Sequence, residues 1–223
     1  MRFLFLFASL LLSACVTVKN PLSTSAKNHQ ADARIALGIS YLQRGERVKA
    51  RENLHKALVH SPNYFRAQLA MAHYLDHVSE YERADNMYQK AIHSQPSNGQ
   101  ILHDYGSFLC KQSRYNSAQT MFDKAIQQPD YLNVAASYES AAFCALKAEQ
   151  TIQAMTYFKR AIAHDPKRAQ SILNLAKLEI EHGKLAIARQ RINLFHQEFG
   201  VRDVSLRLLM KLEQSQKTTS LRP

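Results

Sequence analysis

A pattern of small and bulky apolar residues returns every 34 residues along most of this 223-residue chain. An alanine is followed four positions later by a bulky apolar side chain, and the pair is found again one repeat further on. After a two-residue insertion near residues 130–133 the pattern resumes. A coiled coil would need a period of seven, which the sequence does not sustain. The alanines are Ala50, Ala84, Ala118, Ala154 and Ala188, and their bulky partners are Leu54, Tyr88, Phe122, Phe158 and Ile192.

Each repeat predicts two antiparallel helices that lie close together. A small residue in the first helix lets the second helix approach, and a proline ends the second helix because it lacks an N–H group and crowds the preceding turn. One such unit cannot bury its apolar face alone, so neighbouring units are expected to stack into a solenoid. The small residues are Gly38, Ala72, Gly106, Ala142 and Ala176, the prolines are Pro62, Pro96 and Pro166, and tight turns are expected near Gly45, Ser79, Ser113, Glu149 and Gly183.

This spacing resembles the tetratricopeptide repeat over residues 31–199. The resemblance implies an all-α fold, a right-handed superhelix (α-solenoid) of about five repeats. The fifth repeat is less regular, because Phe195 takes the place of the usual alanine and no proline follows it. Residues 200–223 are expected to add a C-terminal capping helix, with Leu208 and Leu212 on the face that covers the last repeat.

The amino-terminal residues predict an exported lipoprotein. After Arg2 comes an apolar run over residues 3–12, which is too short to span a bilayer and is typical of a signal peptide. The run closes on Leu12-Ser13-Ala14-Cys15, which resembles the bacterial lipobox. That resemblance implies a signal peptide over residues 1–14, cleavage before Cys15, and lipid attached to this cysteine.

The residues that follow Cys15 indicate the membrane to which the lipoprotein is sorted. In lipoproteins of this kind an aspartate after the cysteine favours retention at the inner membrane, and this chain has Val16 there. We therefore expect a lipid-anchored protein on the periplasmic face of the outer membrane. Residues 15–30, which contain Pro21 together with serine, threonine and lysine, are expected to form a flexible tether with a reach of roughly 20 Å.

The formal net charge of the chain is +11. In a cytosolic protein such an excess would suggest a nucleic-acid partner. In the periplasm, anionic lipid headgroups or an acidic protein are the more available counterparts. Since no dense run of Lys and Arg with interleaved aromatic residues is present, we expect a solvated basic surface and no nucleic-acid binding.

Motifs that would carry catalysis or bind a metal are missing. His73 and His77 are four residues apart, as two metal ligands on one helix would be, but there is no HExxH sequence and no third ligand is placed. His103-Asp104-Tyr105 falls inside a repeat helix, where Tyr105 is a core position. The chain has no glycine-rich phosphate loop, GxSxG motif or paired carboxylates. The sequence therefore predicts no metal, no cofactor and no enzymatic activity.

Cys110 and Cys144 are candidates for a disulfide. In an oxidising compartment two cysteines are expected to pair if the geometry allows. They fall in the first helices of neighbouring repeats, which run roughly parallel. A bridge needs Cα atoms within about 7 Å, whereas helix axes usually lie 8–10 Å apart. Two small buried thiols remain the alternative.

First helices line the concave side of tetratricopeptide solenoids, so their exposed positions are the candidate binding site. In the first repeat Ile35, Ile39 and Leu42 form an apolar stripe at helical spacing, which Leu69 continues in the second repeat, where His73 faces the same groove. The stripe predicts a groove for an apolar helix or an extended peptide. Alternatively, the amino-terminal tether covers it. The groove lacks the lysine and asparagine residues with which related domains clamp a terminal carboxylate.

Several segments together resemble the PilF/PilW family. They are the lipobox, Leu37-Gly-Ile-Ser-Tyr-Leu-Gln-Arg-Gly45, Asp104-Tyr-Gly-Ser-Phe-Leu-Cys110, and Tyr138-Glu139 followed by Ala141-Ala-Phe-Cys-Ala-Leu-Lys147. Members are outer-membrane lipoproteins of type IV pilus biogenesis. The resemblance implies that the partners are secretin subunits, whose localisation and multimer assembly the protein assists, and outer-membrane lipid through Cys15. A general periplasmic scaffold for envelope or outer-membrane-protein assembly is the alternative.

Overall fold

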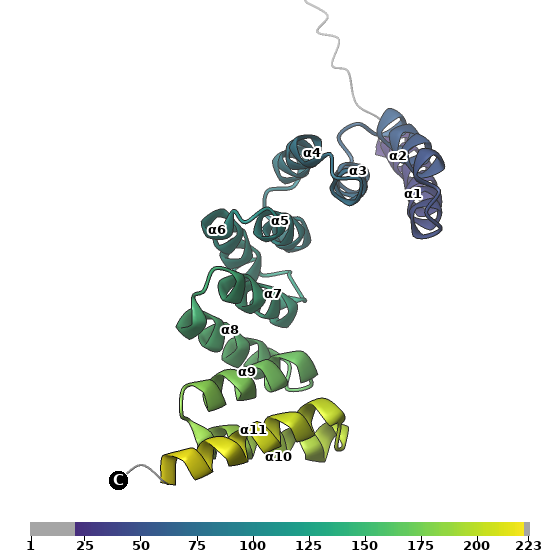
Figure 1. Cartoon of the computed structure of the whole chain (residues 1–223). Helices are drawn as coiled ribbons and strands as arrows, with labels where there is room; N and C mark the ends of the chain where they lie inside the picture. Colours follow the sequence, from purple (N-terminus) through teal and green to yellow (C-terminus); the bar gives the residue numbers. More distant parts are fainter. Residues whose placement is uncertain (1–20, 221–223) are drawn as a thin grey trace, which may run out of the picture. The chain divides into compact units, whose positions relative to one another are not determined.

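The computed structural model describes residues 21–220, which form eleven α-helices joined by short turns (Figure 1). Within this described part, no helix combines the length and the hydropathy needed to cross a membrane. The chain divides into two compact units, Met1–Pro62 and Asn63–Pro223. The helices are α1 Pro21–Gln43, α2 Arg47–His60, α3 Phe65–His77, α4 Tyr81–Ser94, α5 Gly99–Lys111, α6 Tyr115–Ile126, α7 Val134–Lys147, α8 Thr151–His164, α9 Ala169–Glu181, α10 Leu185–Phe199 and α11 Asp203–Ser220.

The first unit is the helix pair α1 and α2. The turn between them has Gly45 at φ 77°, a left-handed conformation that glycine adopts without steric cost. Gly38 of α1 lies directly against α2, because a Cβ atom built on it would come within 2.6 Å of the Leu54 Cγ atom. Ala50 and Ala57 are completely buried in the same contact. The small residues thus permit the close helix approach that the repeat predicts.

Helix α1 begins ten residues earlier than the repeat pattern indicates. The predicted flexible tether over residues 15–30 is therefore wrong for residues 21–30, which are helical, while residues 15–20 lie outside the described part. Proline is well tolerated in the first turn of a helix, and residues 22–30 contain no glycine. Most side chains from Ser23 to Gln30 are exposed, so they lack the apolar periodicity that would have indicated a helix.

The second unit consists of four further helix pairs and α11. Figure 1 shows α4, α6 and α8 following one another along one side of this unit and α3, α5 and α7 along the other. The turns within the pairs lie where they were predicted. Ser79, Ser113, Glu149 and Gly183 have φ values of 64°, 60°, 60° and 70°.

Hydrogen bonds explain why Ser79, Ser113 and Glu149 adopt this conformation although they are not glycine. After α3, the Ser79 N–H group donates to the Asp76 carbonyl at 3.1 Å and the Glu80 N–H group donates to the Leu75 carbonyl at 2.8 Å. This pair of bonds is the Schellman motif, which satisfies carbonyl groups at the end of a helix. The same two bonds recur after α5, α7 and α9.

The repeat positions form the core, as predicted. The five repeat alanines have no exposed surface and their bulky partners are at most 2% exposed. At Gly106 a Cβ atom would meet the Phe122 ring at 3.0 Å and the Ala118 carbonyl oxygen at 3.2 Å. The same close packing of first and second helix therefore operates in both units. The fold is the predicted tetratricopeptide-repeat architecture.

Helix α11 covers the end of the stack. It begins 34 residues after α9, so it takes the place of the first helix of a further repeat. Its Leu212 side chain is fully buried with Ile180 and Ile192, and Leu208 packs at the edge of this cluster. Met210 stands at the position where every earlier first helix has glycine or alanine, and it is 55% exposed. The predicted capping helix is thus present.

Candidate protein-binding site

The predicted apolar stripe of the first unit lies on one face of α1. Ile39 is 43% exposed, and Ile35 and Leu42 beside it are half-buried. Since these positions are four and three residues apart, their side chains are neighbours on the helix surface. The structure thus brings these three predicted residues together as an open apolar strip that a partner could cover.

Leu37 adds an exposed apolar side chain to the same helix, although the repeat pattern makes it a core position. Its equivalent in the third repeat, Tyr105, is buried and stacks on Tyr88 of the preceding helix pair, with ring centroids 5.4 Å apart. This position therefore packs on the preceding repeat. In the described part of the chain no helix pair precedes α1, so Leu37 stays exposed.

Leu69 and His73 lie one turn apart on α3, in the second unit. Leu69 is half-buried, and the exposed His73 ring lies 3.2 Å from the Asp104 carboxylate of α5. His73 is also close to Tyr88, with ring centroids 5.8 Å apart. The five predicted groove residues therefore fall into two sets, three on α1 and two on α3. That they form one continuous groove stays a prediction.

Charged pairs join neighbouring first helices on the surface that α3, α5, α9 and α11 present. Asp76 of α3 accepts hydrogen bonds from the Lys111 ammonium group of α5 at 3.0 and 3.1 Å. Further along, Glu181 of α9 accepts one from Lys211 of α11 at 2.6 Å. Neither pair was predicted from the sequence. The separation of Asp76 and Lys111, one repeat plus one residue, is the signal that could have revealed the first.

A buried polar network ties α5 to α7. The His103 Nδ1 atom lies 2.8 Å from the Ser137 hydroxyl group, and the Tyr131 hydroxyl group lies 2.9 Å from the same oxygen. Burial lowers the pKa of His103 below its ordinary value, because the charged ring would lose its hydration there. Tyr131 comes from the two-residue insertion, and its ring occupies the space beside Gly99. The insertion thus has a structural role.

The next junction, between α7 and α9, uses a partly buried ion pair. Glu139 of α7 accepts a hydrogen bond from the Ser171 hydroxyl group of α9 at 2.6 Å and another from Arg168 at 3.3 Å. Within the following pair, Arg191 of α10 donates two hydrogen bonds to Glu179 of α9, both at 2.8 Å. Glu179 is buried. These contacts join α7 to α9 and α9 to α10 through buried or partly buried charged groups.

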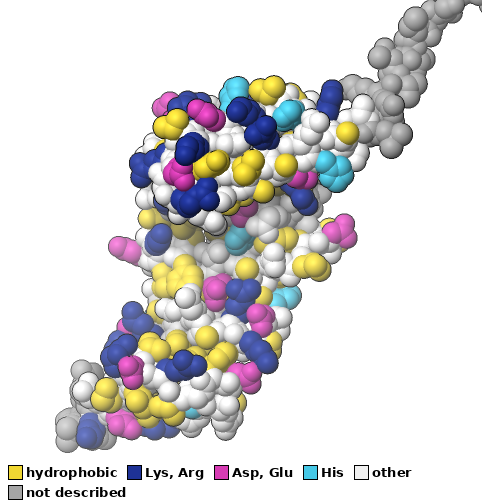
Figure 2. Space-filling view, turned by 90° about the vertical axis from the view of Figure 1, so that its right-hand side faces the viewer, with side chains coloured by type: hydrophobic (Ala, Val, Ile, Leu, Met, Phe, Trp, Pro, Cys, Tyr) yellow, Lys and Arg dark blue, Asp and Glu magenta, His cyan; other side chains and the backbone are white. Residues whose placement is uncertain are grey.

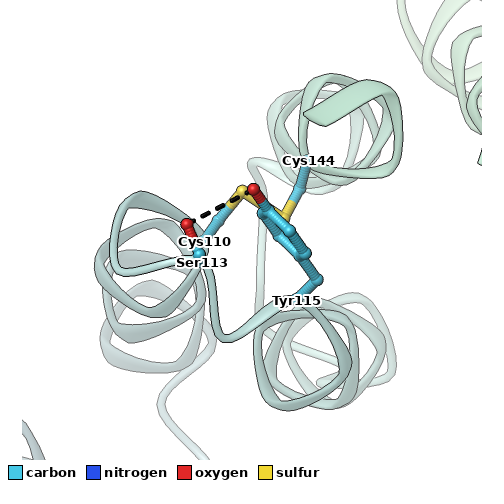
Figure 3. The surroundings of a disulfide bond; sticks show 4 residues. All are labelled: Cys110, Ser113, Tyr115 and Cys144. Carbon is cyan, nitrogen blue, oxygen red and sulfur yellow. Dashed lines mark hydrogen bonds between the residues drawn. A yellow bond between two sulfur atoms is a disulfide. The ribbon is translucent and has the colours of Figure 1, made fainter. Parts of the chain in front are cut away.

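Cys110 of α5 and Cys144 of α7 form a disulfide, with Cα atoms 5.8 Å apart. The bridge joins the first helices of the third and fourth repeats across the insertion. Figure 3 shows the Tyr115 ring beside the two sulfur atoms, and its hydroxyl group donates a hydrogen bond to Ser113 at 3.4 Å. Of the two alternatives that the sequence left open, the structure contains the bridge.

A pocket of about 350 Å³ lies among α8, α9 and α10. Its rim carries an ion pair between Lys167 and Glu198 at 3.2 Å. The sequence did not predict this pocket, because its lining comes from three helices and the turn between α8 and α9, with no shared motif. The apolar part of the lining is Ile162, Pro166, Ile172 and Leu194.

In the part of the chain that it describes, the structure places no third ligand beside His73 and His77, the two candidate metal ligands. Among the described residues, no three His, Cys, Asp or Glu side chains are grouped in a way that could hold a metal ion. His73 instead contacts Asp104. The predicted lipidation site, Cys15, lies outside the described residues, so its modification stays a prediction.

Proteins of two bacteria are similar to this chain in sequence. No profile of a protein family matches it. An uncharacterized protein of Haemophilus influenzae is 34% identical over 167 residues, which are 74% of this chain and 91% of that protein. The type IV pilus assembly protein PilF of Pseudomonas aeruginosa is 33% identical over 204 residues, which are 90% of this chain and 81% of PilF.

Solved structures show the same relationship. The structure of Pseudomonas aeruginosa PilF has a TM-score of 0.75 at 30% identity and covers 87% of this chain and 88% of its own. PilW, described as a type IV pilus biogenesis factor, has a TM-score of 0.70 at 22% identity, with 85% and 87% covered. The tetratricopeptide-repeat protein YrrB, described as having an unusual peptide-binding site, has a TM-score of 0.55 at 19% identity over 74% and 92% of the two chains. The last two likenesses concern the fold.

Proposed function

Because this chain belongs to the PilF/PilW family of tetratricopeptide-repeat proteins in type IV pilus biogenesis, we propose that it is a lipid-anchored adaptor for the pilus secretin. In this proposal it binds secretin subunits at the periplasmic face of the outer membrane. It thereby assists their localisation and the assembly or stability of the multimer. The role is binding, without a catalytic step.

The observation that carries the proposal is the open apolar strip on α1. Ile39 is exposed, although a solvated helix face would normally carry polar residues, and Ile35 and Leu42 extend the same strip. An apolar strip of this kind matches the non-polar face of an amphipathic helix, or alternate side chains of an extended peptide. We assign it to a segment of the secretin subunit.

The anchor supplies the second part of the mechanism. Acyl chains on Cys15 would confine the adaptor to a membrane, and more than one chain is needed for stable attachment because a single chain gives only marginal binding. A secretin segment captured by an anchored adaptor is held near other captured subunits. The effective concentration for assembly rises without any new contact between subunits.

The decisive experiment introduces negative charge into the apolar strip. We expect Ile35→Glu combined with Ile39→Glu to abolish twitching motility and heat-resistant secretin multimers, because a partner would have to desolvate two carboxylates. The matched control is Ile152→Glu with Ile187→Glu, two exposed isoleucines on α8 and α10. Circular dichroism should show an intact fold in both variants. Normal multimer levels in the first variant would overturn the assignment of the strip.

Affinity capture tests the identity of the client. Recovery of the secretin with the unmodified chain, and its loss with the Ile35/Ile39 variant, is the expected result. Recovery of barrel-assembly or wall-synthesis proteins in its place would support the alternative role as a general periplasmic scaffold.

A further inference from the structure

The outward face of α2 combines exposed apolar and cationic side chains. Val48 and Val59 are 73% and 65% exposed. They are eleven residues apart, about three helical turns, so they point in the same direction. We call this surface the α2 outer face. Its members, all exposed, are three cations, one carboxylate, a histidine and the two valines: Arg47, Arg51, Lys56, Glu52, His55, Val48 and Val59.

This face is turned away from the core of the first unit. Ala50, Leu54 and Ala57 occupy the opposite side of α2, where they pack against α1 and have at most 1% exposed surface. No apolar side chain of the core therefore needs Val48 or Val59 as a cover. Two exposed valines among three cations and the single carboxylate Glu52 give this face an apolar patch with a net positive charge, a combination that favours contact with an anionic membrane surface.

The first helix pair is also where positive charge is concentrated. Residues 21–62 contain seven Lys and Arg against three Asp and Glu, whereas residues 63–223 contain twenty against fifteen. Figure 2 shows Lys and Arg side chains surrounding hydrophobic ones over the first helix pair, at the top of the view. One of the three carboxylates, Glu46, is held at the turn by Arg44 and Lys49, at 2.9 and 2.6 Å. The pair as a whole carries an excess of positive charge.

The early start of α1 limits how far this helix pair can lie from an anchored Cys15. Only residues 16–20 separate Cys15 from Pro21, where the helix begins. Fully extended, such a segment spans at most about 20 Å. The attraction between a basic surface and anionic lipid decays within about 8 Å at physiological ionic strength. A connection of this length lets the near end of the helix pair reach the membrane surface, where this attraction acts.

We propose that the α2 outer face rests on an anionic phospholipid bilayer, with Val48 and Val59 at the headgroup boundary and the cations beside them on lipid phosphates. The inference rests on the lipid anchor of the proposed function and adds a second contact with the same membrane. Since α1 packs on the opposite side of α2, the strip of Ile35, Ile39 and Leu42 remains accessible to a protein. The membrane contact would thus orient the adaptor.

The chain contains no tryptophan, so a single introduced indole gives a clean fluorescence signal. The test uses chains that begin at residue 16, which retain every helix of the described part and carry no lipid. With Val48→Trp we expect a blue-shifted emission on vesicles of phosphatidylcholine mixed with phosphatidylglycerol, and none on phosphatidylcholine alone. The matched control is Ile152→Trp, which occupies the same repeat position on α8 and replaces a residue 66% exposed. It should not respond.

Charge removal tests the electrostatic part. Arg51→Gln with Lys56→Gln, in the Val48→Trp background, should weaken vesicle binding roughly thirtyfold, from the attraction expected of two cations near an anionic surface. Lys90→Gln with Lys124→Gln removes two exposed cations from the repeat position of Lys56, in α4 and α6, and should leave binding nearly unchanged.

Three outcomes would overturn the inference. They are the absence of a shift with Val48→Trp, an equal shift with Ile152→Trp, and an equal loss in the Lys90/Lys124 control. A Val48→Trp response to soluble polyglutamate without a response to vesicles would assign the face to an acidic protein. The assay contains neither secretin nor lipid anchor, so its failure is separate from failure of the adaptor role, which twitching and multimer assays report.

Discussion

Reduction of the Cys110–Cys144 bridge should destabilise the third and fourth repeats. The bridge joins residues 34 positions apart and therefore closes a long loop in the unfolded chain. On the chain-entropy account such a loop corresponds to about 4 kcal/mol of stability. In a repeat protein the effect acts on the repeats that the bridge joins and on their neighbours, rather than on the whole chain.

The assay is urea unfolding followed by circular dichroism, with and without a reductant in the equilibration buffer. For a denaturant dependence of about 2 kcal/mol per molar, the midpoint of the affected transition should fall by about 2 M. Mass spectrometry of the unreduced protein should find no free thiol at either position. Reduction adds two hydrogens and removes no other atom, so it tests the bridge without truncating a side chain.

The matched control is the variant Cys110→Ala with Cys144→Ala, whose midpoint should be low in both buffers and unaffected by the reductant. If the native chain shows the same midpoint in both buffers while its thiols are shown to be reduced, the bridge does not constrain the unfolded chain and the entropy argument fails. Two free thiols in the unreduced protein would show that the bridge is absent, and the entropy argument would then not apply.

Three further changes have defined outcomes. Gly38→Ala should destabilise the first helix pair by about 1 kcal/mol in urea unfolding, because crowding against Leu54 outweighs the better helix propensity of alanine; a gain in stability would contradict the close contact. Burial lowers the pKa of His103, so the unfolded chain binds the proton more tightly. Stability should therefore be complete above pH 6.5 or so, the ordinary histidine pKa, and fall below it, and His103→Gln should flatten this dependence in unfolding measurements across that range. Cys15→Ser should move the protein from the membrane to the soluble fraction in cell fractionation, and an unchanged membrane fraction would exclude lipidation.

The fold could be predicted because it follows from the regular spacing of small and bulky residues along the chain. A turn such as Ser79, with its positive φ, lies where the repeat places it although serine gives no local signal for this conformation. Position in the repeat is informative because each small residue must oppose a bulky one across the helix pair, as Gly106 opposes Phe122. Leu37 occupies a core position of the repeat but is exposed, because no helix pair precedes α1 in the described part.

Two kinds of feature could not be predicted in this way. The helical start at Pro21 depends on continuation from a packed helix rather than on apolar periodicity, which residues 21–30 lack. The polar contacts between repeats depend on side-chain directions, as in the bond between His103 and Ser137. The disulfide was undecided for a related reason, since the local approach of α5 and α7 to a Cα separation of 5.8 Å follows from packing and not from spacing.

The side chain of Met210 sets a limit on how this stack could be lengthened. In the earlier repeats a second helix nests against glycine or alanine at this position, as α6 does against Gly106. A thioether there would hold a twelfth helix away by several ångströms. Any duplication that gave α11 a second helix as a partner, in evolution or by engineering, would first have to replace this residue by a smaller one.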